Sequence, residues 1–397
     1  MKHKVTLFAC AATLALIAQS PAPPAYTYAV PPALKDGWTT GSLEQAGIDR
    51  QRIEAMTNSI RTRPELNIHA VLIERGGRLV FEEYFSGKDE RWGDPLGFIV
   101  FNRETKHDLR SVTKSVVSAL VGIANSSGAI RSLDAPLLDY FPEYKDLQTP
   151  ERRAVTLRHA LAMNTGFEWN EDIPYTDPKN DEIVMIRSKD PMRYVLDRPI
   201  IAAPGASWNY NGGSTQALGT VVQRATKRPL ASYATSVLFS PLGITDFEWL
   251  GDLAGVPSAA SGLRLRPRDL AKFGSLYLHN GQWNRKQVLP REWVAESTRR
   301  RMTFPRRPAR GYAYQWWHTC YARPQGTIEV PTAVGNGIQR IFLLREQQTV
   351  VTVLAGRYND FSSNPAEQLL LDFILPALPS AGRATVAAGC PATSSGK

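Results

Sequence analysis

Apolar runs near both ends of the chain alternate with turns in the pattern of β-hairpins. The first hairpin is expected to turn at Gly76–Gly77, because paired glycines suit the tight turns between antiparallel strands, and the second at the polar segment 345–348. The four predicted strands are 69–74, 79–85, 339–344 and 349–355. An apolar helix is expected from about 365 to 375. Strands at both ends predict one antiparallel sheet that joins N-terminal and C-terminal segments.

Between these hairpins, apolar positions recur mainly at helical spacing, and loops rich in glycine, proline and asparagine separate the helices. The helices expected there are 111–125, 157–163, 214–225, 231–239, 267–279 and 290–297, and a further helix is expected before the first hairpin, at 42–62. The pattern predicts an α/β (α+β) fold, in which an antiparallel sheet is flanked by helices and carries a large, mainly helical insertion. One domain is expected at 30–380, with a sheet frame at about 40–105 and 305–380, a helical part at about 106–304, and a flexible tail at 381–397.

The N-terminal segment has the pattern of a secretory signal peptide. Basic residues precede an apolar run from Val5 to Ala18, which is too short to span a bilayer, and a proline-rich stretch follows. We expect approximately residues 1–29 to be removed, the protein to be exported to the periplasm or the medium, and no membrane-spanning segment to remain. A lipoprotein anchored through Cys10 is less favoured, because that cysteine lies inside the apolar run.

Composition refines this picture only slightly. The chain has 397 residues, of which 43% are hydrophobic and 21% charged, as in globular rather than disordered or fibrous proteins. Its formal net charge of +10 is a modest excess that indicates no nucleic-acid partner. The arginine-rich run 299–310 is expected to be a solvated face, with contact to an anionic envelope surface as the alternative. After removal of Cys10, Cys320 and Cys390 remain, and the sequence leaves open whether they pair.

The first candidate for chemistry is the pair Ser111 and Lys114, which opens an apolar helix. Positions three apart share one helix face, so the ammonium group of Lys114 can reach the hydroxyl group of Ser111. Free N–H groups at a helix N-terminus favour developing negative charge, and burial makes a lysine easier to deprotonate, as a general base requires. Ser-x-x-Lys alone is weak, because Ser394 and Lys397 repeat the spacing in the tail without a helix, and Ser111 by itself is equally well a helix cap.

Two glycine-rich segments are the other candidates. Tyr210 precedes a predicted helix and is followed by Asn211 and Gly212, and a tyrosine held near Lys114 can relay a proton to a leaving group. The segment 335–340 leads into a strand, where glycines let a substrate lie along the strand edge and leave an N–H free as an oxyanion donor. Taken alone, Tyr210 is more simply interpreted as a packed aromatic residue in a loop, and the segment 335–340 as a turn that leads into a strand.

In this order the three segments resemble the serine β-lactamase and penicillin-binding-protein superfamily, whose Ser-x-x-Lys, Tyr-x-Asn and Lys-Thr-Gly elements follow one another. Further strings similar to that family are 132–142, 155–166, 238–244 and 260–274, so the resemblance covers most of the mature chain. Within the superfamily the chain looks most like the class C β-lactamase branch and its 6-aminohexanoate-dimer hydrolases and esterases. The resemblance implies a β-lactamase/transpeptidase-like fold, a Ser111 nucleophile, acid–base catalysis by Lys114 and Tyr210, and no metal or organic cofactor.

The same resemblance implies a set of substrate-binding residues. These are Asn211, Gly212, Tyr175, Asn336, Gly337, Ile338 and Gln339. Tyr175 belongs to the set because the loop after Gly166 borders the pocket in the resembling amide hydrolases. The oxyanion is expected between the backbone N–H of Ser111 and that of Ile338 or Gln339.

Two departures from the family pattern bear on the substrate. Gly212 stands where the family usually has Asn or Ser, so a contact to Lys114 is missing unless Asn211 supplies it. Asn336–Ile338 takes the place of Lys-Thr-Gly without its cation, which would meet a β-lactam or peptide carboxylate, and Arg340 replaces that charge only if it points inward. We therefore expect a small ester or amide substrate. The alternatives are a β-lactamase or D-alanyl-D-alanine carboxypeptidase, and a non-catalytic binding protein; the oligomeric state stays open.

Overall fold

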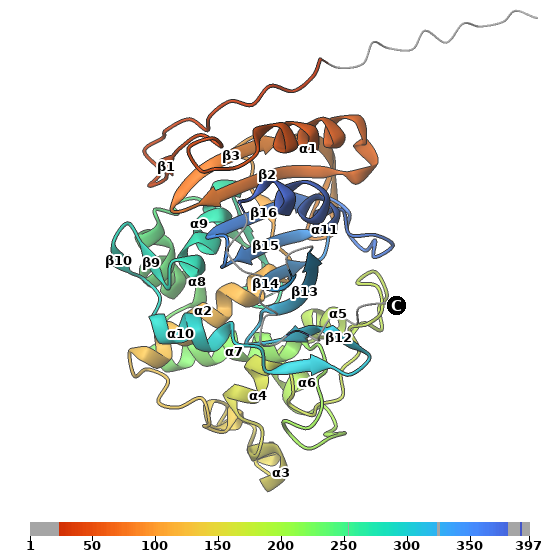
Figure 1. Cartoon of the computed structure of the whole chain (residues 1–397). Coiled ribbons are helices and arrows are strands. Elements are labelled where there is room, and N and C mark those ends of the chain that lie inside the picture. The colour runs from red at the N-terminus through yellow and green to blue at the C-terminus, as the bar shows by residue number, and fades with distance from the viewer. Residues whose placement is uncertain (1–23, 253, 324–325, 380–389, 391–397) are drawn as a thin grey trace, which may run out of the picture.

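The computed structural model describes residues 24–252, 254–323, 326–379 and 390 (Figure 1). Its main sheet has nine strands in the order β1-β3-β2-β16-β15-β14-β13-β12-β11. N-terminal and C-terminal segments meet inside this sheet, where β2 pairs with β16 in antiparallel fashion, as the sequence predicted. The strands are β1 (Thr39–Thr40), β2 (Ile68–Arg75), β3 (Arg78–Tyr84), β11 (Met302–Phe304), β12 (Arg307–Tyr312), β13 (Trp317–Arg323), β14 (Gly326–Gly335), β15 (Gln339–Leu344) and β16 (Thr349–Ala355).

Both predicted hairpins are confirmed. The strands β2 and β3 turn at Gly76–Gly77, whose positive φ angles of 57° and 80° favour glycine. Along β2 successive side chains point to opposite faces, so Val71 and Ile73 enter one apolar core while Ala70 and Leu72 enter the other. Both faces of the sheet are therefore buried, which explains why these strands have long apolar runs instead of strict alternation.

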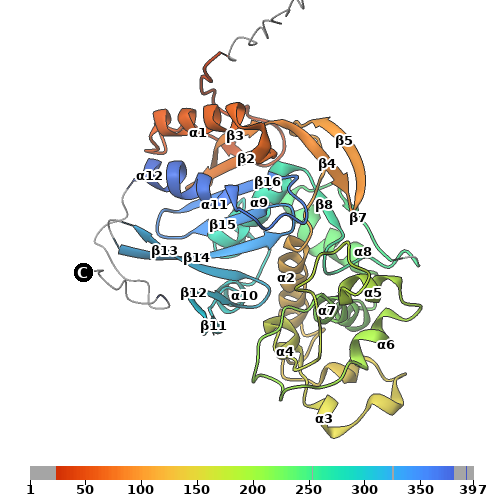
Figure 2. The ribbon, with the colours of Figure 1, turned by 90° about the vertical axis from the view of Figure 1, so that its right-hand side faces the viewer.

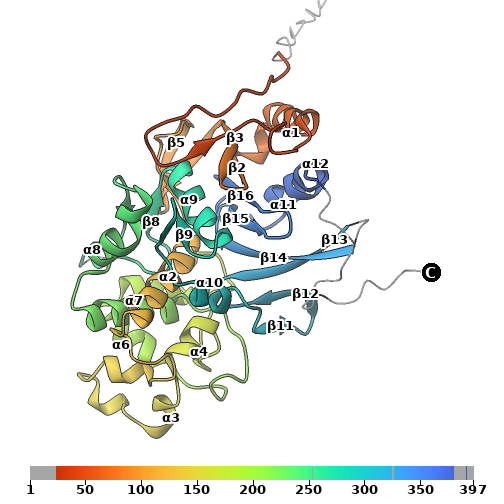
Figure 3. The same ribbon diagram turned by 60° about the vertical axis from the view of Figure 1, so that its left-hand side comes forward.

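Helices cover the two faces of the sheet (Figures 2 and 3). One core lies between the sheet and α1 (Arg50–Thr62), α11 (Pro365–Leu369) and α12 (Leu375–Ala377). The other core contains α2 (Val112–Ser126) and α9 (Pro267–Leu278), and it continues into the helical part of the molecule. Helix α2 is buried along nearly its whole length, so its N-terminal turn has a fixed position.

The helical part packs around α2 and α7, which contact each other directly. Its helices are α3 (Pro150–Arg153), α4 (Leu157–Ala162), α5 (Asp181–Arg187), α6 (Pro191–Leu196), α7 (Gly212–Thr226), α8 (Leu230–Ala234) and α10 (Arg291–Ser297). The predicted helices at 111–125, 157–163, 214–225, 267–279 and 290–297 are confirmed within about two residues. The short helices α3, α5 and α6 were not predicted, because they lie in segments rich in loop-forming residues.

Three predicted elements need correction. The helix expected at 42–62 begins only at Arg50, because the side chain of Asp49 accepts two backbone N–H groups of the first turn and caps the helix there. The helix expected at 231–239 is α8 followed by a π-helical turn at Thr235–Phe239. The sheet frame was expected to run to about residue 105, but the chain leaves the main sheet after β3. It then forms a separate hairpin of β4 (Ser86–Arg91) and β5 (Asp94–Val100).

A second small sheet leads to the helical part. It has three strands in the order β6 (His107–Asp108), β8 (Leu263–Leu265) and β7 (Glu248–Trp249). A two-stranded hairpin, β9 (Gln282–Trp283) with β10 (Lys286–Gln287), follows α9. Because β6 ends three residues before the start of α2, its pairing with β8 holds the segment that enters that helix.

The two cysteines left open by the sequence form a disulfide, Cys320–Cys390, which ties the C-terminal segment to β13. Residues 1–23 of the segment predicted to be removed (about 1–29) and most of the predicted tail lie outside the described residues. Tyr28, near the end of that segment, is described and buried, and its hydroxyl donates to the carbonyl oxygen of Val80 at 2.8 Å. Among the residues that are described, no helix is long and apolar enough to cross a membrane.

Candidate active site

Ser111 and Lys114 come together at the start of α2. Lys114 Nζ lies 3.0 Å from Ser111 Oγ, as the three-residue spacing predicted, and it also donates to the carbonyl oxygen of Ala260 at 3.0 Å. Lys114 is 1% exposed and Ser111 9% exposed, so the lysine is fixed behind a serine that reaches a cavity. The string at 260–274 thus supplies a backbone partner that orients the lysine.

The backbone before Ser111 is held in an unusual conformation. Arg110 has a φ of 48°, in the left-handed region, whereas Ser111 has right-handed values of −65° and −7°. Successive residues of opposite hand turn neighbouring N–H groups toward one point and create a concave anion site. Within the described residues the N–H of Ser111 has no hydrogen-bond partner, which suits an oxyanion donor.

Tyr210 lies beside this pair, directly before α7. Its ring centroid is 4.9 Å from Lys114 Nζ, and the side chain lines the same cavity as Ser111. Burial raises the pKa of Tyr210, although the charge of Lys114 opposes this, so the phenol stays protonated. Asn211 is buried and caps α7 by accepting the N–H of Ser214 at 2.8 Å, so its side-chain oxygen is used in the helix cap and does not contact Lys114.

Two carboxyl groups that the sequence analysis missed take the place of the absent side chain at Gly212. Glu182 Oε2 lies 3.5 Å and Glu171 Oε1 3.9 Å from Lys114 Nζ. A Cβ atom on Gly212 would lie 2.5 Å from the carboxylate of Glu182, so only glycine leaves room for it. No local motif marks these two acids; the signal available was the glycine in the second motif together with an acid-containing loop after Gly166.

This environment corrects the expectation that burial makes Lys114 easy to deprotonate. Burial alone would lower the pKa of Lys114, but Glu182, Tyr210 and Glu171 outweigh it and raise the pKa above the ordinary value. The resting side chain is therefore an ammonium group. Lys114 can accept the proton of Ser111 only after the ammonium group has lost a proton, which a rise in pH favours.

The third predicted segment forms the turn between β14 and β15, with Asn336, Gly337 and Ile338 facing the same cavity as Ser111. Gln339 does not line it: its buried amide donates to the carbonyl oxygen of Ala355 and accepts the N–H of the same residue, so its side chain anchors the turn. Arg340 lies at the cavity edge, where its guanidinium donates to the carbonyl oxygens of Gly335 and Gln339. The positive charge of Arg340, whose direction the sequence left open, therefore lies at the cavity, but part of its guanidinium is hydrogen-bonded to backbone carbonyl groups.

Gly335 lets this turn approach the nucleophile. A Cβ atom there would overlap the carbonyl oxygen of Leu109, two residues before Ser111. That carbonyl accepts the N–H of Val112 at 3.1 Å and begins the first turn of α2. A glycine at the end of β14 therefore allows close contact between the strand and the loop that carries Ser111.

The cavity at Ser111 has two arms that differ in character. One arm, of about 520 Å³, is lined largely by aromatic and apolar side chains, with Asp172, Arg307 and Asp360 among its charged ones, and the other, of about 270 Å³, is lined mainly by polar and charged residues together with Trp92, Ile183 and Ile186. The first includes Ile173, Trp208, Phe304, Trp317 and Phe361; the second includes Glu90, Arg110, Arg187, Asn336 and Asn359. Ser111, Tyr175 and Asn336 line both, so a bond held at Ser111 would have an apolar and a polar side.

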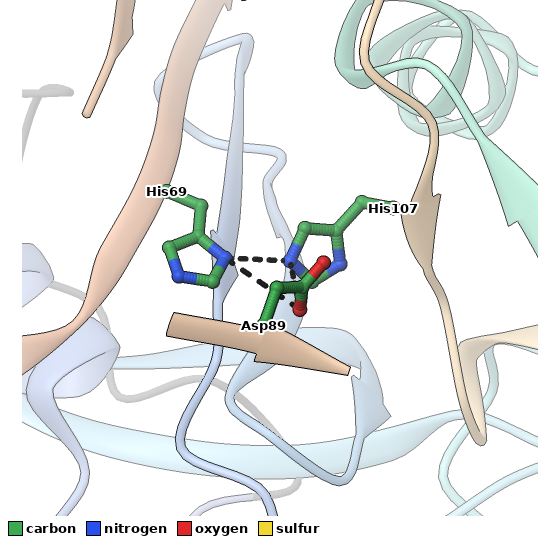
Figure 4. Close-up of side chains that lie close together, drawn as sticks. All are labelled: His69, Asp89 and His107. Atoms are coloured by element: carbon green, nitrogen blue, oxygen red, sulfur yellow. Dashed lines mark hydrogen bonds and ion pairs between the residues drawn. The ribbon is translucent and has the colours of Figure 1, made fainter. Parts of the chain in front are cut away.

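Behind the site, the described residues contain one group that could offer three metal ligands: His69, Asp89 and His107 (Figure 4). His69 Nδ1 and His107 Nε2 lie 2.8 Å apart, at hydrogen-bond distance, whereas two nitrogen ligands of a tetrahedral zinc ion lie about 3.3 Å apart. Asp89 accepts the hydroxyl of Tyr358 at 2.9 Å, and His107 Nδ1 donates to the carbonyl oxygen of Asp108 at 2.9 Å. The group is thus arranged as a hydrogen-bond network that anchors β6 ahead of Ser111.

Comparison with known proteins gives relatives among hydrolases. The chain is 26% identical over 216 residues to "Esterase EstB" of Burkholderia gladioli, and this match covers 52% of the chain and 53% of the esterase. It is 25% identical over 306 residues to "6-aminohexanoate-dimer hydrolase" of Paenarthrobacter ureafaciens, covering 72% of each. The chain thus spans about half of the first relative and nearly three quarters of the second.

Solved structures establish the fold. "EstCE1, a hydrolase with promiscuous acyltransferase activity" superposes with a TM-score of 0.67 at 15% identity, covering 83% of this chain and 99% of that one. A penicillin-binding protein from Bacillus halodurans has a TM-score of 0.59 at 18% identity, covering 79% and 98%. A model of the family named Beta-lactamase matches residues 56–374. The chain therefore belongs to the β-lactamase family.

Proposed function

We propose that the protein cleaves ester or amide bonds of small molecules through an acyl-enzyme on Ser111. The observation that carries the proposal is the 3.0 Å contact between Ser111 Oγ and buried Lys114 Nζ at the mouth of a cavity that Tyr210 also lines. A fixed base beside a hydroxyl at a helix N-terminus is the arrangement of an activated nucleophile. The esterase and amide-hydrolase relatives support the same reaction class.

In the proposed reaction, deprotonated Lys114, with Tyr210, takes the proton of Ser111 as its oxygen attacks the carbonyl carbon. The oxyanion lies between the N–H of Ser111 and an N–H of the turn at Ile338. Tyr210 then protonates the leaving alcohol or amine, and water hydrolyses the acyl-enzyme by the same groups in reverse. The sum is one water consumed and one ester or amide bond broken.

The two arms of the cavity favour an amphiphilic substrate. Tyr210 stands among Trp208 and Trp317, with ring centroids 6.2 Å and 5.6 Å away, so a leaving group protonated by Tyr210 would enter the aromatic arm. The polar arm would take the acyl part and suits one that bears polar groups, because it holds both cations and carboxylates and Arg110 there is paired with Glu90. We infer an ester or amide of an apolar or aromatic alcohol or amine, and we propose that hydrolysis takes place outside the cytoplasm, from the signal-like N-terminus.

Intact-mass spectrometry tests the proposal directly. The purified mature protein and its Ser111→Ala variant are incubated in parallel with a fluorophosphonate, a short p-nitrophenyl ester, a p-nitroanilide and a penicillin. We expect one phosphonyl adduct and ester turnover, both absent from the variant, and comparison of ester with anilide rates gives the preferred bond.

The same experiment distinguishes the alternatives. A stable penicilloyl adduct or penicillin hydrolysis would place the substrate in the cell wall, as one structural neighbour suggests by its name. Labelling that persists in Ser111→Ala, or no labelling of either protein, would refute the Ser111 acyl-enzyme.

A further inference from the structure

Two buried carboxyl groups beside Lys114 have no place in the three motifs. Glu171 lies in the loop after α4, and Glu182 lies in the first turn of α5. Their side chains are 0% and 3% exposed, and their oxygens lie 3.9 Å and 3.5 Å from Lys114 Nζ. If all three groups were ionised, two negative charges would face one positive charge among almost fully buried side chains, which is an unfavourable excess of buried charge.

Gly212 brings the two carboxyl groups together. A Cβ atom on Gly212 would lie 2.5 Å from Glu182 Oε2 and 3.0 Å from Glu171 Oε2, so one oxygen of each group converges on the space that the glycine leaves free. Like charges at such short range cannot both persist, and the two groups titrate as a unit that holds one proton.

The hydrogen bonds of the pair are unequal. Glu171 accepts Trp169 Nε1 at 2.7 Å, the N–H of Gly212 at 2.6 Å and the hydroxyl of Tyr175 at 2.8 Å. Glu182 Oε1 accepts the hydroxyl of Ser261 at 2.7 Å, whereas its Oε2 has no hydrogen-bond partner among the described residues. That oxygen is the one nearest Lys114, so the uncompensated part of the pair faces the ammonium group.

We propose that Glu171 and Glu182 are positioning residues that share one proton, so that a single negative charge rests beside Lys114 and sets the pH range in which Lys114 can accept the proton of Ser111. The inference deepens the proposed function and rests on it. Glu171 borders the aromatic arm of the cavity and Glu182 the polar arm, but their side chains are 0% and 3% exposed and lie beside Lys114, so we assign them an action through that lysine.

Three phenols lie around the pair, and the polar arm that Glu182 borders also contains the charged side chains of Glu90, Arg110 and Arg187. Tyr175 faces it from its own loop, Tyr210 from the start of α7 and Tyr312 from β12. Burial raises the pKa of each of these phenols, so they stay neutral and leave Lys114 as the cation that faces the pair. Burial and the charge of Glu182 raise the pKa of Glu171 to about 8, in agreement with one shared proton at neutral pH.

The proposal predicts an unusual pattern among charge-removing variants. In Glu171→Gln or Glu182→Gln, the remaining carboxyl group loses its like-charged neighbour, ionises fully and keeps one negative charge beside Lys114. The ascending limb of the pH profile of kcat/KM is then expected to move by less than about half a pH unit. In the double variant no negative charge remains, the pKa of Lys114 falls, and the limb moves to lower pH by about one to three units.

The test is the pH dependence of both ester turnover and fluorophosphonate labelling from pH 5 to 10, for wild type, the two single variants and the double variant. Glu168→Gln is the matched control, because this exposed acid of the same loop pairs with Arg198 outside the site. Glu182→Asp retains the charge and is expected to keep the limb in place even where the rate falls. Circular dichroism checks that every variant is folded.

If the double variant does not fold, Gly212→Ala gives a second route, since its methyl group would meet both Glu182 Oε2 at 2.5 Å and Glu171 Oε2 at 3.0 Å; displacing both carboxyl groups from Lys114 is expected to move the limb to lower pH. The proposal is overturned if the ascending limb of the pH profile stays at its wild-type position in the double variant or in folded Gly212→Ala. It is also overturned if each single variant moves the limb by one to three units, because that would mean two ionised carboxylates. These results are separate from failure of the proposed function, which appears as activity or labelling retained in Ser111→Ala.

Discussion

Replacing Gly335 by alanine tests whether β14 determines the position of the nucleophile. Gly335 is the last residue of β14, and an added Cβ would fall well within 3.0 Å of the carbonyl oxygen of Leu109. The same carbonyl accepts the N–H of Val112 in the first turn of α2. Relieving the overlap moves either the strand or this turn by roughly half an ångström or more. Ser111 lies between Leu109 and Val112 in the chain, so a shift of the turn moves Ser111 as well.

The expected effect on catalysis is larger than the effect on stability. A displacement of about 1 Å in a reacting group can cost about 100-fold in rate, so we expect Gly335→Ala to lose about 10- to 100-fold in kcat/KM, equivalent to about 1.4–2.7 kcal/mol. Overpacking of this kind costs about 1–3 kcal/mol of stability, which leaves the enzyme folded at 25 °C.

Gly274→Ala is the matched control. Its Cβ would lie 2.6 Å from Val350 and 2.7 Å from Ile341, between α9 and the sheet and away from Ser111. The assay is p-nitrophenyl ester turnover at 25 °C with thermal unfolding of both variants. Both are expected to have a lower Tm, but only Gly335→Ala a lower kcat/KM; wild-type kcat/KM in Gly335→Ala, or equal losses in both, would refute the reasoning.

Three further outcomes are expected. Lys114→Ala should lose at least about 1,000-fold in ester turnover with an unchanged circular dichroism spectrum, and a near-wild-type rate would remove Lys114 from the mechanism. Phe304→Ala should lower kcat/KM for an aryl ester about tenfold relative to a methyl ester, because it lines only the aromatic arm; equal losses for both esters would contradict the assignment of the two arms. Cys320→Ser opens a link that spans 70 residues and should lower the free energy of unfolding by at most about 4 kcal/mol in urea titrations. Thiol titration of the unreduced wild type should find no free thiol from Cys320 or Cys390.

The parts of the fold that were predictable are those encoded by local pattern. The hairpin turning at Gly76–Gly77 and the second, at 345–348, each follow from apolar runs around a turn, and their strands agree with the structure within about one or two residues. The hairpin β4–β5 was missed because β4 is polar, whereas β5 is apolar but mostly exposed, so neither strand shows the apolar and polar alternation of a half-buried strand. Helix α1 was predicted too long, because the capping residue Asp49 was not weighed against the helical pattern around it.

The same limit applies to the site. Ser111 and Lys114 were predictable because three residues along a helix bring them to one face, and the geometry is local. The oxygen atoms of Glu171 and Glu182 reach the same lysine from a loop and from another helix, so their proximity depends on how the chain folds. The side-chain direction of Gln339 was likewise not predictable: a position next to the turn does not determine which way a side chain points, and here it points into the sheet, while the backbone N–H of Gln339 stays a predicted oxyanion donor.

Gly212 links what the sequence could show with what only the fold reveals. From the sequence, this departure from the family pattern indicates a lost contact to Lys114. A glycine has no side chain, so the sequence does not show which groups occupy the free space. In the structure that space is filled by the carboxyl groups of Glu171 and Glu182, so a neutral side chain is replaced by negative charge. The exchange changes the chemistry of the lysine: with an amide or hydroxyl beside it, burial alone would favour the neutral base, whereas a carboxylate favours the ammonium form. An enzyme built this way should therefore activate Ser111 best at alkaline pH.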